Sequence, residues 1–118
     1  MEFRHIPWSE VRKPGENGLR RCLEAEGFDV RRWRDPADRV YAQHCHPHDE
    51  SLWVVRGRIV LHVDGHEVPL GPGDRVELPR GTPHAAHCGP EGAVYLIGQR
   101  QGLDGTGPTP SRRGDVAL

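Results

Sequence analysis

Residues 44–57 read HCHPHDESLWVVRG, and this stretch joins three histidines and two carboxylates to a run of β-branched and aromatic residues. Along a β-strand, side chains two positions apart point to the same face. We therefore expect His44 and His46 to point the same way, with Glu50 joining them after a local irregularity at Pro47. Two imidazoles and a carboxylate that converge on one point suit a divalent transition metal.

Short strand patterns separated by turn residues flank this stretch on both sides. Asp64-Gly65 is a strong signal for a two-residue β-hairpin turn. The chain also contains 15 glycines and 11 prolines, which suits many tight turns. The pattern predicts seven or eight short strands at a spacing of about ten residues, typical of an antiparallel sandwich or barrel. The clearest expected strands are 38–46, 51–56, 58–63, 66–70, 75–78, 84–87 and 93–99.

The two ends of the chain are expected to differ from this strand-rich centre. Residues 1–16 read as an extended arm with room for one short strand. A short helix is predicted over 18–26, with Asn17 as N-cap, an apolar stripe at Leu19, Cys22 and Leu23, and Gly27 as the stop signal. Its narrow stripe predicts packing on the outside of a larger unit. Residues 101–118 look like a flexible tail by composition, unless a second subunit holds them.

The spacing of the histidines and glycines resembles that of the cupin superfamily. The first cupin motif is His-x-His, three or four residues, Glu, six residues and Gly, and here it is matched by His44, His46, Glu50 and Gly57. The second motif is matched by Gly73, Pro79, Gly81 and His84, but Cys88 stands where the pattern has Asn. The resemblance covers about residues 38–99, with the short inter-motif stretch of small bacterial single-domain cupins.

This resemblance implies the fold and a metal site. The expected fold is all-β, a single antiparallel jelly-roll barrel with a short N-terminal helix. The expected domain organisation is an arm and helix over 1–37, a barrel core over 38–99 and a tail over 100–118. The family pattern carries over as one divalent transition metal per chain (Fe, Mn, Ni or Zn) held by His44, His46, Glu50 and His84. The substitution at Cys88 falls on a position that is not a ligand in the pattern.

Other residues near the motifs are candidates for the pocket or for neighbouring surfaces. His48 is either a substitute ligand, a neighbour of the ligands or a solvated histidine. An apolar pocket wall is expected from Leu52, Val54, Val76 and Leu78, with Cys88 near the barrel mouth. Strand alternation predicts that five side chains face the outside of the barrel: Tyr41, Gln43, Trp53, Val55 and His87. We expect Cys45 to be a small packed thiol, Trp8 and Trp33 to cover the outside, and His62 and His66 to be exposed strand residues.

Composition narrows the classes of partner. The chain has 118 residues, with 16 basic and 17 acidic side chains, so its formal net charge is −1. This balance provides no electrostatic reason for a nucleic-acid or membrane partner. No apolar run approaches the roughly 20 residues that span a bilayer, and no signal peptide is evident. Three cysteines are an odd number, which favours reduced thiols and a cytoplasmic location.

The function expected from the resemblance is that of a small-molecule metalloenzyme, of oxygenase, isomerase or lyase type. Three neutral imidazoles and one carboxylate leave a divalent ion with a net positive charge, so a ligand or substrate with an anionic oxygen is expected. A non-catalytic ligand-binding or sensor cupin is an alternative, and so is a structural zinc cupin, because four donors complete a tetrahedral zinc shell. The sequence names no catalytic acid or base and leaves turnover open. The family also implies a homodimer.

Overall fold

Seven strands and one helix make up the computed structural model, which describes residues 3–9 and 15–100. All pairings among the described strands are antiparallel. No described helix is long and apolar enough to span a membrane. In chain order the elements are β1 (Arg4–Ile6), α1 (Glu16–Ala25), β2 (Asp29–Asp35), β3 (Val40–His44), β4 (Asp49–Val63), β5 (His66–Leu70), β6 (Arg75–Leu78) and β7 (His84–Arg100).

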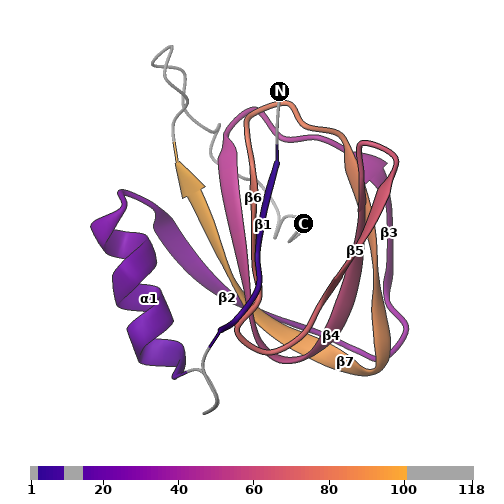
Figure 1. Cartoon of the computed structure of the whole chain (residues 1–118), viewed down its shortest axis with the longest axis horizontal. Helices are drawn as coiled ribbons and strands as arrows, with labels where there is room; N and C mark the ends of the chain where they lie inside the picture. Colours follow the sequence, from indigo (N-terminus) through magenta and orange to yellow (C-terminus); the bar gives the residue numbers. More distant parts are fainter. Residues whose placement is uncertain (1–2, 10–14, 101–118) are drawn as a thin grey trace.

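The strands curl around an enclosed interior, and α1 lies outside it beside β2 (Figure 1). The sheet order is β1-β6-β4-β7-β2, and in addition β3 pairs with β7 and β5 with β4. The long strands β4 and β7 pair with each other along most of their lengths. The remaining paired strands join the sheet through these two, with β5 and β6 on β4 and with β2 and β3 on β7. This architecture confirms the predicted all-β barrel with one short helix, and β1 is the short strand for which the N-terminal arm had room.

Two long strands replace four predicted short ones. Gly57 was expected to end a strand, but β4 continues through it with register shifts against β7 on both sides. Gly57 has φ +80°, and a Cβ there would lie 2.2 Å from the carbonyl oxygen of Gly92. Gly92 also has positive φ, at +74°. The glycines therefore let the two strands bend around the barrel in close contact, where larger residues would collide.

The hairpin between β4 and β5 follows the sequence signal. Val63 pairs with His66 across the turn. Asp64 and Gly65 have φ values of 51° and 78°, so both central residues adopt the left-handed conformation of a type I′ turn. This confirms the predicted hairpin and its register.

The helix starts earlier than predicted. The N-cap is Gly15, whose carbonyl accepts the first helical hydrogen bond from Leu19 at 3.1 Å, so Asn17 lies inside the first turn. The end is as expected: Gly27 has φ +90° and its N–H donates to Glu24, while Phe28 donates to Leu23. This pair of bonds is a Schellman motif. The helix packs on the barrel through an outer apolar cluster of Leu19, Leu23, Phe28 and Leu96, with Trp8, Val30, Trp53 and Val55 partly buried against it.

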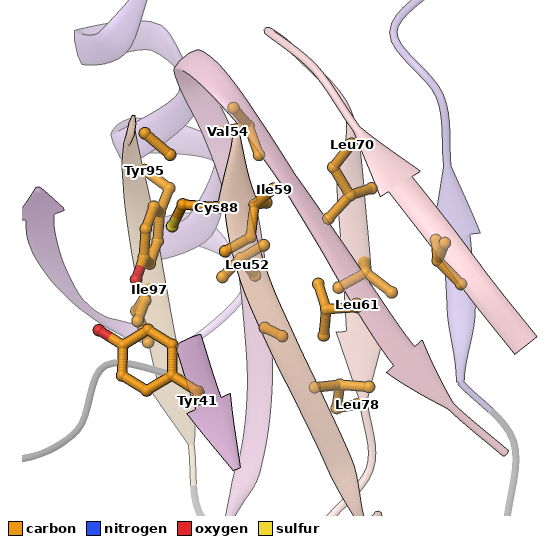
Figure 2. Packing of buried hydrophobic residues seen from close by; sticks show 14 of the residues in the cluster. Tyr41, Leu52, Val54, Ile59, Leu61, Leu70, Leu78, Cys88, Tyr95 and Ile97 are labelled. Carbon is orange, nitrogen blue, oxygen red and sulfur yellow. The ribbon is translucent and has the colours of Figure 1, made fainter. Parts of the chain in front are cut away.

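The barrel interior is filled by a second apolar cluster. The predicted inward set of Leu52, Val54, Val76 and Leu78 belongs to it, and each of these side chains is buried. Figure 2 shows several of these side chains together with Ile59, Leu61 and Ile97. Trp53 and Val55, which alternate with the inward residues of β4, lie in the outer cluster instead. Strand alternation therefore predicted correctly which residues of β4 face the core.

Alternation failed for Tyr41 on β3. Tyr41 was expected to point outward, but it is buried in the interior cluster, near Tyr95 in Figure 2. The register of β3 against β7 shifts between Tyr41, opposite Ala86, and His44, opposite His84. Three steps along β3 thus match two steps along β7. This bulge puts Tyr41 and His44 on the same inward face. Trp33 likewise packs partly buried against the interior cluster instead of covering the outside.

Candidate metal centre

The four side chains predicted as ligands meet at one end of the barrel interior. His44 ends β3, His46 follows it, Glu50 lies near the start of β4 and His84 begins β7. The ring centroids are 4.6 Å apart for His44 and His84, 4.8 Å for His44 and His46, and 5.3 Å for His46 and His84. Glu50 Oε1 lies 3.6 Å from His46 Nε2. The structure therefore brings together residues up to 40 positions apart in the sequence.

Backbone carbonyls orient two of the imidazoles. His44 Nδ1 donates to the carbonyl of Ala42 at 2.6 Å, and His84 Nδ1 donates to that of Thr82 at 2.9 Å. With the proton on Nδ1, each ring presents the lone pair of Nε2 toward the cluster. Such an arrangement fixes the tautomer that binds a metal. Burial lowers the pKa of the His84 imidazole below its ordinary value, against the opposing effect of the hydrogen bond to Thr82, so this ring stays neutral.

The donor atoms of this cluster have no hydrogen-bond partner among the described residues. Seven buried side-chain nitrogen and oxygen atoms in the described part of the chain lack a hydrogen bond. They are Nε2 of His44, His46 and His84, both carboxylate oxygens of Glu50, and both ring nitrogens of His48. Buried polar groups without partners are costly and rare in proteins. Their concentration at one place fits a cation that accepts their lone pairs, and a mixed imidazole and carboxylate set suits a divalent transition metal.

His48 belongs to the same cluster. The solvated alternative is wrong, because His48 is 6% exposed and its ring stacks on that of His46 at a centroid distance of 5.2 Å. His48 Nε2 lies 3.6 Å from Glu50 Oε1. Two groups of three possible ligand atoms therefore share His46: one with His44 and His84, the other with His48 and Glu50. His46 and His48 lie between β3 and β4, so strand alternation does not place them, and only the folded loop brings His48 beside Glu50.

Several outlying residues lie away from this cluster. Gln43, His66 and His87 are exposed, as expected, and His62 is half-buried. Cys45 is also exposed, so the expectation of a packed thiol is wrong. It lies just beyond the end of β3, where the chain has left the sheet.

A buried carboxylate that the sequence analysis missed lies deeper in the barrel. Asp35, at the end of β2, is 4% exposed. Its Oδ1 accepts hydrogen bonds from Trp33 Nε1 at 3.0 Å and from the Tyr41 hydroxyl at 2.7 Å. Its Oδ2 accepts from the Tyr95 hydroxyl and from Cys88 Sγ, the latter at 3.7 Å. Asp35 stands before Pro36, and no local pattern marks it as buried, so only the folded chain reveals this network.

Cys88 therefore lies inside the barrel and not at its mouth. It is four residues beyond His84 on β7, about 13 Å along the strand. Burial, followed by the nearby Asp35 carboxylate, raises the pKa of the Cys88 thiol to about 12. Burial and the bond to Asp35 likewise raise the pKa of Tyr41 to about 12. Both groups hold their protons in the folded protein.

We expect Cys88 to resist alkylation in the folded protein, because only the thiolate reacts and this thiol stays protonated and covered. Iodoacetamide at pH 8 should modify the exposed Cys22 and Cys45, and mass spectrometry should find Cys88 free until denaturant is added. Unfolded chains lose the Cys88 proton near pH 9.0, against about 12 when folded, so stability should fall as the pH rises through this interval. Labelling of Cys88 as fast as Cys45 would contradict its placement.

Comparisons with known proteins agree with this fold. Residues 32–97 match the Cupin domain family. An acireductone dioxygenase of Gluconacetobacter diazotrophicus is 43% identical over 51 residues, covering 40% of this chain and 28% of that protein. The crystal structure of DMSP lyase DddQ from Ruegeria pomeroyi has a TM-score of 0.60 and 31% identity, covering 70% of this chain and 42% of the lyase.

A third relative shows the fold alone. An RmlC-like cupin from Shewanella frigidimarina has a TM-score of 0.56 at 24% identity, covering 65% of this chain and 69% of that one. The chain thus matches less than half the length of the dioxygenase and of the lyase. The family match covers more than half of the sequence, and the barrel agrees with it. With its two histidine motifs in the predicted order, this chain belongs to the cupin superfamily.

Proposed function

We propose that this chain is a metal-dependent enzyme of oxygenase, isomerase or lyase type that acts on a small molecule with an anionic oxygen. The observation that carries the proposal is the group of buried, unpartnered donor atoms at one end of the barrel. In this proposal His44, His46, Glu50 and His84 hold one divalent transition metal. Bound there, the metal would supply Lewis-acid chemistry or, if it is iron, redox chemistry.

The protein's own groups would prepare the site for its ligand. The carbonyls of Ala42 and Thr82 keep two imidazoles in the tautomer whose Nε2 faces the cluster. A single carboxylate among neutral imidazoles leaves the occupied site positively charged, which favours an anionic oxygen. Below the cluster, the side chains of Leu52, Val76 and Leu78 fill the interior with apolar surface. An apolar wall with one charged point is how small-molecule sites are commonly built.

His48 is the proposed proton-handling group. Once four donors are assigned to the metal, its imidazole remains beside Glu50, and neither ring nitrogen is hydrogen-bonded to a residue of 3–9 or 15–100. A neutral imidazole has one nitrogen that donates and one that accepts, so His48 can hold or pass a proton at Nε2.

The relatives support the enzyme class without identifying the reaction. One is named a dioxygenase and the other a DMSP lyase, and both names describe chemistry on small molecules. The structural-zinc alternative is favoured by the donor count, because three imidazoles and one carboxylate complete a tetrahedral shell. A complete tetrahedral shell leaves no coordination position for a fifth donor. The buried His48 imidazole beside the four ligands therefore favours an open site over a structural one.

Elemental analysis of protein purified without metal-affinity resin tests the proposal, with His46→Ala as the variant. His46 is chosen because it belongs to both groups of possible ligands. About one iron or manganese per chain, lost in His46→Ala and kept in the exposed control His5→Ala, is expected. Oxygen consumption with small carboxylic acids and phenols would then separate oxygenases from isomerases and lyases.

Two results would overturn this proposal. Stoichiometric zinc with no turnover of any tested substrate would leave the structural alternative. Absence of bound metal from both proteins, even after dialysis against Fe²⁺, Mn²⁺, Ni²⁺ and Zn²⁺, would point to a metal-free ligand-binding module.

A further inference from the structure

A second pair of histidines lies on the outer surface of the barrel. His62 on β4 alternates with the buried Leu61 and Val63, and His87 on β7 alternates with the buried Ala86 and Cys88. Both imidazoles therefore project from the outside of the sheet, away from the interior cluster. Val60 pairs with His87 and Ala85 with His62, so the two histidines are diagonal neighbours on adjacent strands.

The two rings are already placed for a shared ligand. Their centroids are 5.3 Å apart, the rings are inclined by 28°, and His62 Nε2 lies 3.3 Å from His87 Nδ1. Two imidazole nitrogens bound to one tetrahedral ion at 2.0–2.1 Å are separated by about 3.3–3.4 Å. Without a metal, this contact meets the geometry of a hydrogen bond between the two rings, which holds them at this distance. The observed spacing thus matches that of a chelate.

A carboxylate flanks the pair on the same face. Glu67 on β5 is the direct cross-strand partner of His62. It is exposed and alternates with the buried Val68, so it shares the outer face with His62. Directly opposed residues have Cβ atoms about 4.5–5.5 Å apart, within reach of a flexible glutamate side chain. In the structure the three ligand atoms do not all lie within 4.8 Å of one another, so Glu67 would complete the site through a change of side-chain rotamer.

We infer that His62, His87 and Glu67 form a second divalent-metal site, on the outer face of the barrel and separate from the interior centre. Imidazole with carboxylate suits Zn²⁺, Ni²⁺ or Cu²⁺, with water completing the coordination. The site needs no rearrangement of the backbone, because both histidines stand on paired strands. The inference does not rest on the proposed enzyme activity, since the interior ligands point to the opposite face of the sheet.

Equilibrium dialysis of untagged, chelator-treated protein against Ni²⁺ tests this inference. Ni²⁺ is the probe because it suits imidazole ligands. We expect two Ni²⁺ per wild-type chain and one in the His62→Gln/His87→Gln variant. Glu67→Gln should weaken binding of the second ion, and the exposed control His5→Gln should keep both. In a His46→Ala background, paramagnetic Ni²⁺ should broaden the imidazole NMR signals of His62 and His87.

The number of Ni²⁺ ions that each variant loses distinguishes the outer site from the interior centre of the proposed function. If the His62→Gln/His87→Gln variant binds as many ions as the wild type, the outer site does not exist. If the wild type binds a single ion that only His46→Ala removes, the outer site is likewise excluded and the interior centre stands. A single ion that survives His46→Ala but not the double variant would support the outer site and count against the interior one.

Discussion

Glu50→Gln is expected to abolish metal binding at the interior centre and, at the same time, to stabilise the metal-free protein. The Glu50 side chain is 2% exposed, and neither of its oxygens has a hydrogen-bond partner in the described structure. A buried carboxylate in this state costs folding free energy that a bound cation offsets. Removing the charge should stabilise the metal-free form by at least about 1 kcal/mol, or about 4 °C in Tm. The part of the metal-induced rise in Tm that comes from the interior centre should be present in the wild type and lost in Glu50→Gln.

The measurement is thermal unfolding of both proteins with and without added metal, together with elemental analysis. Glu91→Gln is the matched control, because Glu91 is exposed and lies outside the cluster. It should change neither Tm nor metal content. A metal-free Glu50→Gln protein that is less stable than the wild type would contradict the prediction. That result would mean that Glu50 is held by charged histidines, of which His46 and His48 are the nearest at 3.6 Å.

Asp35→Asn is expected to cause the largest loss of stability among conservative substitutions of this chain. The Asp35 carboxylate accepts hydrogen bonds from Trp33, Tyr41, Tyr95 and Cys88. Asparagine replaces one of the two carboxylate oxygens by an NH₂ group. The two side chains that donated to that oxygen then face another donor. Leaving two buried donors without acceptors should cost about 3 kcal/mol, a large part of the roughly 5–15 kcal/mol that stabilises a domain.

Urea unfolding followed by tryptophan fluorescence measures this loss. Asp29→Asn is the control, because Asp29 begins the same strand and is exposed. Its effect should stay within about 0.5 kcal/mol. Replacing the opposing donor as well, in Asp35→Asn/Tyr95→Phe, should recover part of the loss, because fewer polar groups are then left unsatisfied. An Asp35→Asn protein as stable as the wild type would show that the carboxylate does not hold this network together.

The Asp35 network connects the two strands that carry His44 and His84. Tyr41 lies three residues before His44 on β3, and Cys88 lies four residues after His84 on β7. Asp35 thus binds side chains from the two strands that carry these histidines. Cys88 stands where the second motif has asparagine, and its thiol donates a hydrogen bond to the Asp35 carboxylate.

Many elements of the fold could be predicted from the sequence because the signals for them are local. Alternation assigned Leu52 and Val54 to the interior and Trp53 to the outer cluster, as the structure confirms. Asp64-Gly65 set the hairpin, and Gly27 set the end of the helix. The spacing of His44, His46, Glu50 and His84, together with the glycines and proline of both motifs, predicted the family. The structure brings these four side chains together.

Only the tertiary structure decided what depends on contacts between distant segments. The bulge before His44 turned Tyr41 inward, and alternation within one strand carries no information about such a register shift. Gly57 and Gly92 bend long strands because they meet each other, whereas Gly57 alone resembled a strand end. Asp35 became a buried acceptor because β3 and β7 deliver three of its four donors, and Trp33 on its own strand supplies the fourth. Local pattern therefore determined the elements and motifs of this cupin, and close packing between strands determined which polar groups are buried together.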